Sequence, residues 1–314
     1  MSSALITAPP PAPAADPTTA LTQAAATWTA RWLAPYLGAM RFRNIALDEV
    51  FYDVGGLSLA EHDWLLGQTT DEGVILVVHP AGRREMGIAK HADIADLRAT
   101  PGAMLRRFSI AGVGSSDLGA AAFARTLANR YQEPVGAIVA GYGLSDIAAE
   151  AMGGWFALGA ANRWIAVANR LDRTIDRLMG APVSADTWRL GPERCDADTL
   201  RALFRDPDRE IRSIAGHSKG ALAIASAFQS VSASGDRAMI ARARAARVVT
   251  FGAVVALPPE FDQLAQYLGA LDGFGAANSQ IGAKATLVPG AGHHLNPRWP
   301  GALNAARILA REPR

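Results

Sequence analysis

Blocks of hydrophobic and polar residues alternate along the chain from about residue 72 onward. Short apolar runs, typical of strands buried on both faces, are separated by stretches with helical spacing. Helices are expected at 90–100 and 118–131. Strands are expected at 73–82, 106–114, 133–143, 209–216, 246–257 and 283–292. Because helices separate the strand runs, the pattern predicts an α/β fold with a mostly parallel central sheet and helices on both faces.

The segment 144–205 interrupts this rhythm. Its pattern fits about two helices followed by a polar loop, and no strand run appears before Ile211. We interpret it as a helical cap inserted over the carboxyl ends of the strands, where open α/β sheets carry their ligands. Apolar residues of the segment, Trp155 and Phe156 among them, would then bind substrate in an acyl-group pocket. The alternative is a helix packed on the core.

The N-terminal segment differs from the rest of the chain in composition. Residues 1–20 are dominated by Pro, Ala and Thr, and we expect a disordered tail there. Trp28, Trp32 and Tyr36 then recur every four residues and predict a helix with one apolar face. Its expected role is to cover the sheet, and docking to a membrane or granule is the alternative. Residues 21–314 are expected to form a single domain that includes the insertion.

Composition narrows the class of protein. Of the 314 residues, 50% are hydrophobic and 19% are charged, which predicts a globular chain with a sizeable core. The net charge of +2 gives no reason to expect a nucleic-acid partner. The one cysteine, Cys195, excludes a disulfide within the chain and fits a reducing compartment. Without an apolar run long enough to span a bilayer or a cationic signal-peptide start, we expect a cytoplasmic protein with no transmembrane segment.

The sequence GHSKG at 216–220 is the strongest chemical signal. It lies between a strand run and a run of small helix formers. A strand that turns into a helix within one residue would hold Ser218 out of the sheet in a strained backbone conformation. Glycines at both flanking positions would remove the clash of strand with helix, and alternate alanines from 221 to 227 would let the helix lie close to the sheet. The pattern indicates a nucleophile for acyl transfer rather than a structural turn.

This motif and the later VPGAGHHLN, 288–296, resemble the α/β-hydrolase superfamily, in particular its lipase and carboxylesterase branches. The resemblance covers roughly residues 70–300 in architecture, but only the two motifs closely. It implies an α/β-hydrolase fold and a catalytic triad in the chain order Ser, Asp, His. We choose His293 as the base because it directly follows Gly292, and the adjacent His294 is the alternative.

The acid of such a triad would lie between the strand run at 246–257 and the loop with His293 and His294, called the histidine loop below. Glu260, Asp262 and Asp272 are the candidates. We choose Asp272, because a carboxylate in an apolar setting needs a partner such as an imidazole. Glu260 and Asp262 fit the solvated first turn of a helix. The sequence shows no separate strand that ends at Asp272, as the family pattern would require.

An oxyanion hole requires two backbone N–H groups. Lys219, directly after the nucleophile, would provide one. For the other we expect Ser115 or its neighbour Ser116 in the loop GVGSSDLG, and the alternative is the loop HPAGRR with Ala81 or Gly82. The glycines of GVGSSDLG do not match GxGxxG and no acidic residue ends the next strand run, which argues against a dinucleotide-binding oxidoreductase.

The sequence therefore predicts a serine hydrolase that cleaves carboxylic esters and needs neither a cofactor nor a metal. The apolar insertion favours a lipid-like or polyester acyl group over a small polar ester, and a thioester is equally compatible with the triad. A different class stays open: a binding or granule-surface protein that has the fold without the chemistry. The oligomeric state is not predicted. Histidines outside the 288–296 motif are expected to be hydrogen-bonded or surface residues: His62, His79, His91 and His217.

Overall fold

The computed structural model describes residues 47–68, 73–82, 86–100, 105–112, 115–140, 196–280 and 282–312, all within one compact unit, Asn44–Arg314. Several sequence predictions fall outside these residues. They are the tail at 1–20, the helix with Trp28 and Trp32, Cys195, and the part of the insertion that contains Trp155 and Phe156.

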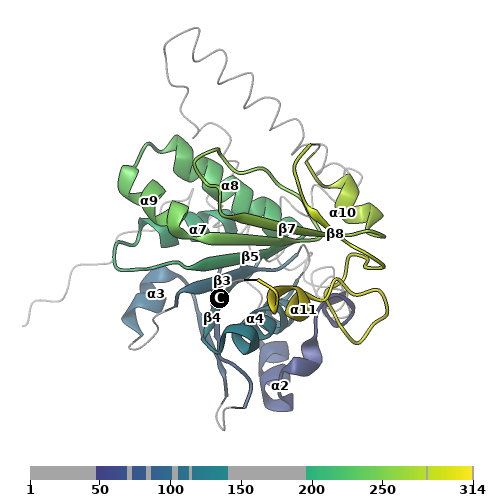
Figure 1. Cartoon of the computed structure of the whole chain (residues 1–314). Coiled ribbons are helices and arrows are strands. Elements are labelled where there is room, and N and C mark those ends of the chain that lie inside the picture. The colour runs from purple at the N-terminus through teal and green to yellow at the C-terminus, as the bar shows by residue number, and fades with distance from the viewer. Residues whose placement is uncertain are drawn as a thin grey trace, which may run out of the picture. The chain divides into compact units, whose positions relative to one another are not determined.

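One sheet organises the described residues, with eight strands in the order β2-β1-β4-β3-β5-β6-β7-β8 (Figure 1). The strands are β1 (Ile75–Val78), β2 (Ile88–His91), β3 (Arg107–Ile110), β4 (Val135–Ile138), β5 (Ser213–His217), β6 (Arg247–Phe251), β7 (Leu264–Gly269) and β8 (Thr286–Val288). β1 runs antiparallel to its neighbours β2 and β4, and all other neighbours pair in parallel. The predicted α/β class with a mostly parallel sheet is confirmed.

The sheet is buried on both faces, and the residues of β1 show how. Ile75 and Val77 belong to one hydrophobic core, while Leu76 and Val78 belong to the other. Successive side chains of a strand point to opposite faces, so an unbroken apolar run is what a doubly covered strand requires. The sequence ILVV meets this requirement, and all four residues are buried.

Helices cover both faces (Figure 1). One face carries α4 (Asp117–Tyr131), with α2 (Leu59–Gly67) and α11 (Ala305–Leu309) packed beside it. The other face carries α3 (Ile94–Ala99), α7 (Asp196–Arg205), α8 (Lys219–Ala233) and α9 (Arg237–Ala245). No helix in the described part of the chain has the length and apolar character needed to cross a bilayer.

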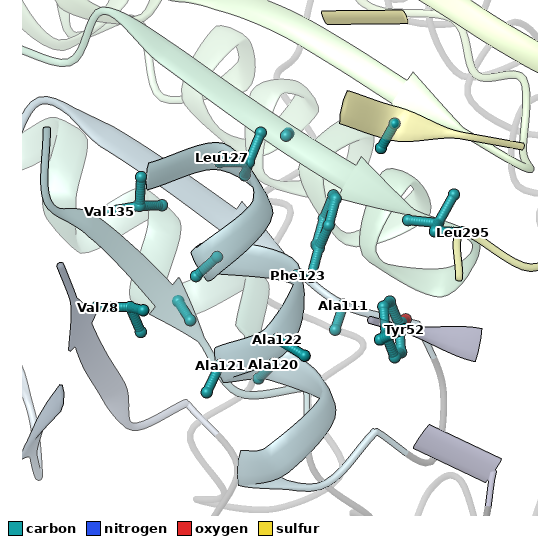
Figure 2. Packing of buried hydrophobic residues seen from close by; sticks show 14 of the residues in the cluster. Tyr52, Val78, Ala111, Ala120, Ala121, Ala122, Phe123, Leu127, Val135 and Leu295 are labelled. Atoms are coloured by element: carbon teal, nitrogen blue, oxygen red, sulfur yellow. The ribbon is translucent and has the colours of Figure 1, made fainter. Parts of the chain in front are cut away.

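Small side chains bring α4 close to the sheet, as Figure 2 shows around Ala120, Ala121 and Ala122, which are buried. Phe123 fills the space at the end of this core, where its ring lies 6.0 Å from that of Tyr52. Alanine is also the best helix former, so the same residues favour the helix and its close packing. The core thus extends to Tyr52, which precedes every predicted strand.

Two strands were not predicted, and the reason is their composition. β7 reads LAQYLG and lacks β-branched residues, while it buries the polar Gln266. Both polar atoms of the Gln266 side chain are hydrogen-bonded: its oxygen accepts from Val255 N–H at 2.7 Å and from the Thr250 hydroxyl at 3.2 Å, and its nitrogen donates to the Lys284 carbonyl at 2.9 Å. The other missed strand, β2, occupies the start of the helix expected at 90–100, and the helix itself begins later, at Ile94.

The end of the predicted insertion forms part of the layer over the sheet. Residues 196–205 are α7, and its apolar residues Leu200, Leu203 and Phe204 are fully buried in the core that α8 and α9 share. Residues 196–205 therefore form a helix packed on the core, as in the alternative interpretation of the insertion, and not a cap. Residues 144–195 lie outside the described residues.

The strand run expected at 246–257 is shorter than predicted. β6 ends at Phe251, because Gly252 takes a positive φ of 66° that strands do not accommodate. The region around Glu260 and Asp262 is a turn that leads into β7, and the helix expected there is absent from these described residues. A strand, β7, therefore leads to the loop that carries Asp272.

Candidate active site

Ser218 lies at the junction of β5 and α8, with φ 52° and ψ −118°. Among the described non-glycine residues, only Gln132 shares a positive φ. Backbone hydrogen bonds hold this conformation: Ser218 N–H donates to the Phe251 carbonyl at 2.9 Å, and the Ser218 carbonyl accepts from Ala221 N–H at 3.0 Å. A non-glycine residue in this region costs on the order of 1–3 kcal/mol and is found mainly where function requires it.

The glycines on either side of the junction are required by close contacts. A Cβ at Gly216 would lie 2.8 Å from the backbone nitrogen of Ala221, and a Cβ at Gly220 would lie 2.7 Å from the Ala111 carbonyl and clash with that of Ile110. Both contacts are far closer than van der Waals distance. The close backbone approach that the GHSKG spacing predicts is therefore present at Gly216 and at Gly220.

Replacing Gly220 with alanine is expected to destabilise the fold by about 3 kcal/mol, because the new methyl group meets rigid backbone atoms. Urea denaturation followed by circular dichroism measures this. Gly67→Ala is the matched control: it lies at the end of α2 with nothing within 4 Å of an added Cβ, and we expect no loss there. Equal midpoints for the two variants would contradict the close contact.

Three of the predicted residues come together at the carboxyl ends of β5, β7 and β8. His293 Nε2 lies 3.1 Å from Ser218 Oγ, and His293 Nδ1 lies 2.7 Å from Asp272 Oδ2. Ser218 is 6% exposed, and the Asp272 side chain is fully buried. The side chains form one hydrogen-bonded series, in which the hydroxyl contacts the imidazole and the imidazole contacts the carboxylate.

Asp272 follows the end of β7 and is the N-cap of α10 (Gly273–Ala277). Its Oδ1 accepts a hydrogen bond from Gly275 N–H at 2.6 Å, while Oδ2 faces His293. A buried carboxylate is costly unless its oxygens are hydrogen-bonded, and here each oxygen has a partner. The backbone N–H of α10 and the imidazole therefore fix the orientation of this carboxylate.

The imidazole of His293 packs against two aromatic rings. Phe274 lies 4.9 Å away between ring centroids, and Phe51 lies 5.8 Å away, both nearly perpendicular to the imidazole. The alternative base, His294, instead directs Nε2 to the Pro300 carbonyl at 3.1 Å. Of the two histidines, the structure brings only His293 to Ser218.

The alternative acids lie elsewhere among the described residues. Glu260 accepts a hydrogen bond from the Ser232 hydroxyl on α8, and Asp262 is exposed. Neither side chain contacts His293. The structure thus places Asp272, and neither of the other two candidates, at the imidazole.

The expected oxyanion donors have mixed outcomes. Lys219 is the first residue of α8, directly after Ser218, as expected. Ser115 donates its backbone N–H to the Gly112 carbonyl at 3.2 Å, so that group is engaged within its own loop. Two of the three alternatives are engaged too: Ser116 N–H donates to Asp48 at 2.9 Å, and Ala81 N–H donates to the Asn129 side chain at 2.7 Å.

The loop after β3 nevertheless lies next to the nucleophile. A Cβ at Gly112 would be 3.4 Å from the Cβ of Ser218. The two residues that follow, 113 and 114, lie outside the described residues, as do Trp155 and Phe156. The backbone of this loop therefore approaches Ser218, and its proposed role as a source of the second oxyanion donor stays a prediction.

Four residues around this site were not predicted from the sequence. Asp48, Phe51 and Tyr52 come from a short helical turn before the first predicted strand, and His217 was expected to be an ordinary hydrogen-bonded or surface residue. This turn contacts the histidine loop as well: the Phe51 carbonyl accepts from Leu295 N–H at 2.8 Å. The one sign in the sequence was that His217 precedes Ser218 within the motif.

Burial keeps His217 neutral. The residue is 1% exposed, and burial is the main cause that lowers its pKa from 6.5 to about 3, with a further contribution from the nearby His293. Its ring centroid lies 5.0 Å from that of His293. Burial acts in the opposite sense on the carboxyl group of Asp48 and raises its pKa from 3.8 to about 7, although hydrogen bonds from Ser116 counteract the shift.

These two groups are expected to give opposing slopes of stability against pH. Between pH 3 and 6.5 the unfolded chain binds the His217 proton and the folded chain does not, so stability falls on acidification. Between pH 3.8 and 7 the folded chain binds the Asp48 proton more tightly, so stability falls as pH rises. Each slope reaches about 1.4 kcal/mol per pH unit at most.

The His217→Gln variant should therefore gain stability relative to the natural chain as pH decreases from 7 to 5, and Asp48→Asn should lose it. Urea denaturation at pH 5, 6 and 7 measures both differences. The titratable side chains that interact with His217 are those of Tyr52, His293 and His294. Differences that do not vary with pH would contradict the assigned buried states.

Comparison of the chain with protein-family models, with curated protein sequences and with solved structures found no match. The description of the site thus rests on its geometry. Among the residues that the structure describes, no three His, Cys, Asp or Glu side chains gather as possible metal ligands. What the arrangement offers is a hydroxyl whose proton can pass to an imidazole held by a carboxylate.

Proposed function

We propose that the chain is a serine hydrolase that cleaves carboxylic esters through Ser218, His293 and Asp272. The observation that carries this proposal is the hydrogen-bonded series Ser218–His293–Asp272, with distances of 3.1 and 2.7 Å. The strained backbone of Ser218 at a strand-to-helix junction supports it, because such strain has no structural advantage. The sheet order and the two motifs further support a resemblance to the α/β-hydrolase superfamily.

The proposed reaction proceeds by acyl transfer in two halves. Ser218 Oγ attacks the ester carbonyl while His293 Nε2 takes its proton, and the resulting oxyanion accepts a hydrogen bond from Lys219 N–H. His293 then donates the proton to the leaving alcohol, which yields an acyl-enzyme. Water, deprotonated by His293, attacks this ester, and the carboxylic acid leaves as Ser218 regains its proton.

The carboxylate of Asp272 has two tasks in this scheme. By accepting from Nδ1–H, it keeps Nε2 unprotonated toward Ser218. By its charge, it stabilises the imidazolium that forms after proton transfer. Because Gly275 N–H and His293 occupy its two oxygens, the carboxylate needs no rearrangement during the reaction.

A fluorophosphonate probe tests the proposal, because it phosphonylates an activated serine with loss of fluoride. The natural chain should be labelled, and Ser218→Ala should not. Ser226→Ala is the matched control, since Ser226 is exposed on the same helix, α8, and should label as the natural chain does. No labelling of the natural chain would overturn the proposal and favour a binding protein that has the fold without the chemistry.

The substrate class is proposed from the sequence alone. The apolar residues of the insertion, including Trp155 and Phe156, favour a lipid-like or polyester acyl group. A series of p-nitrophenyl esters of increasing chain length should then show kcat/KM rising from acetate to longer esters, by roughly tenfold for each two methylene groups buried. Preference for acetate, with long esters refused, would contradict an apolar acyl pocket. Thioesters measured in parallel distinguish the two leaving groups.

A further inference from the structure

Three hydrogen bonds run in series beside the nucleophile. Gly112 N–H donates to the Tyr52 hydroxyl oxygen at 2.6 Å, and this hydroxyl lies 2.8 Å from His217 Nδ1. On the other side of the ring, His217 Nε2 lies 2.9 Å from the carbonyl oxygen of His293. Tyr52 is 3% exposed and His217 is 1% exposed, so water does not compete for these partners.

The chemistry of the partners fixes the direction of every bond. A carbonyl oxygen can only accept, so the proton of neutral His217 is on Nε2. Nδ1 must then accept, and the Tyr52 hydroxyl donates to it. The backbone of Gly112 can only donate, and the Tyr52 oxygen accepts from it. Each of the three links is satisfied with the ring neutral and in one tautomer.

This series joins the parts of the site that come from distant segments. One end holds the loop after β3 at Gly112, whose position is next to Ser218. The other end holds the main chain of His293, the residue that contacts Ser218. Figure 2 shows the Tyr52 ring beside Ala111, the residue before Gly112, and Leu295, which follows the two histidines, belongs to the same core cluster.

We infer that His217 and Tyr52 are positioning residues, which hold the His293 loop and the loop after β3 in register with Ser218 through a neutral Nε2–H imidazole. This inference rests on the proposed function, because it assigns the two residues to the same reaction. Neither side chain touches the reacting atoms in it. A neutral ring at this place also leaves the imidazolium of His293 without a repelling neighbour 5.0 Å away.

The first test measures the protonation of the His217 ring nitrogens in the absence of substrate. In the natural chain labelled with ¹⁵N histidine, the His217 ring should keep Nε2 protonated and Nδ1 unprotonated from pH 5 to 9. The Tyr52→Phe variant should shift the Nδ1 resonance, because that nitrogen loses its donor, while Tyr267→Phe should not. Tyr267 is the matched control, since its hydroxyl bonds Glu312 and no residue of the site. A protonated Nδ1, or titration near pH 6.5, would overturn the inference.

The second test measures how much Tyr52 and His217 contribute to kcat. Tyr52→Phe should lower kcat by up to about 100-fold with KM changed less than about twofold, since misplacement of reacting groups by about 1 Å has such effects. Tyr267→Phe should leave both constants unchanged. A double-mutant cycle with His217→Gln should be non-additive, because either change breaks the same series. A kcat for Tyr52→Phe within twofold of the natural value would overturn the role.

The two tests separate this inference from the proposed function. If the natural chain reacts with neither fluorophosphonate nor esters, the proposed function fails, whatever the tautomer of His217. If the natural chain is active and Tyr52→Phe is folded and equally active, only the positioning role fails. Should His217→Gln fail to fold, Tyr52→Phe alone still decides, because it removes one oxygen from a residue whose ring contacts remain.

Discussion

Ser218→Ala is expected to reduce kcat for ester hydrolysis on the order of a millionfold, the loss seen when the nucleophile of a serine hydrolase is removed. The hydroxyl group is the only part of the residue that reaches His293, at 3.1 Å. Its removal leaves no atom to form the acyl-enzyme, and only oxyanion stabilisation and substrate binding remain. Steady-state hydrolysis of a p-nitrophenyl ester by the natural chain and the variant measures the ratio.

The fold should survive this substitution, so the loss can be assigned to chemistry. The Ser218 side chain makes no capping hydrogen bond to α8, and alanine can occupy the same space. The thermal midpoint should stay within a few degrees of the natural value, which corresponds to about 1 kcal/mol in a domain of this size. Activity within about tenfold of the natural chain, in a variant free of contaminating enzyme, would show that Ser218 is not the nucleophile.

Asp272→Asn is expected to reduce kcat by about 10⁴-fold, the effect that the equivalent change has in a serine protease. The contacts of Asp272 explain the size. Gly275 N–H requires an oxygen at its position, which orients the amide so that its nitrogen faces His293 Nδ1. An amide nitrogen donates, so Nδ1 must accept and the imidazole proton moves to Nε2. That nitrogen can then no longer take the proton of Ser218.

The matched control for this prediction is Asp262→Asn, at the alternative acid that the sequence allowed. Asp262 is exposed and contacts no residue of the site, so its replacement should leave kcat and KM unchanged. Both variants should be folded, as circular dichroism and denaturation can show. Equal effects of the two substitutions on kcat would exclude Asp272 as the partner of the base.

Local signals account for what the sequence predicted. The strand-turn-helix junction at Ser218 is marked in the sequence by nearby residues, namely the two glycines and the alanines of α8. The apolar runs of strands such as β1 are also local, since burial on both faces requires every residue to be apolar. For these reasons the sheet, the junction at Ser218 and the choice of His293 over His294 as its neighbour could be argued from short segments.

Long-range contacts account for what the sequence did not predict. Tyr52 and His217 are 165 positions apart, and the residues around each of them do not indicate that the two side chains are hydrogen-bonded. β7 was missed because Gln266 is polar, and only its three distant hydrogen-bond partners make its burial acceptable. The proposed role of Ser115 as an oxyanion donor stays a prediction, and the local turn that engages its N–H with the Gly112 carbonyl was not predicted from residue types.

The left-handed backbone of Ser218 has a consequence for how this sequence can change over time. Glycine would adopt φ 52° without the penalty of about 1–3 kcal/mol that serine bears, so the chain should be more stable to heat with glycine than with serine at this position. A library screened only for heat resistance should therefore enrich Ser218→Gly, and such variants should lack the proposed esterase activity. Retention of serine at that corner would mean that something other than heat resistance maintains it.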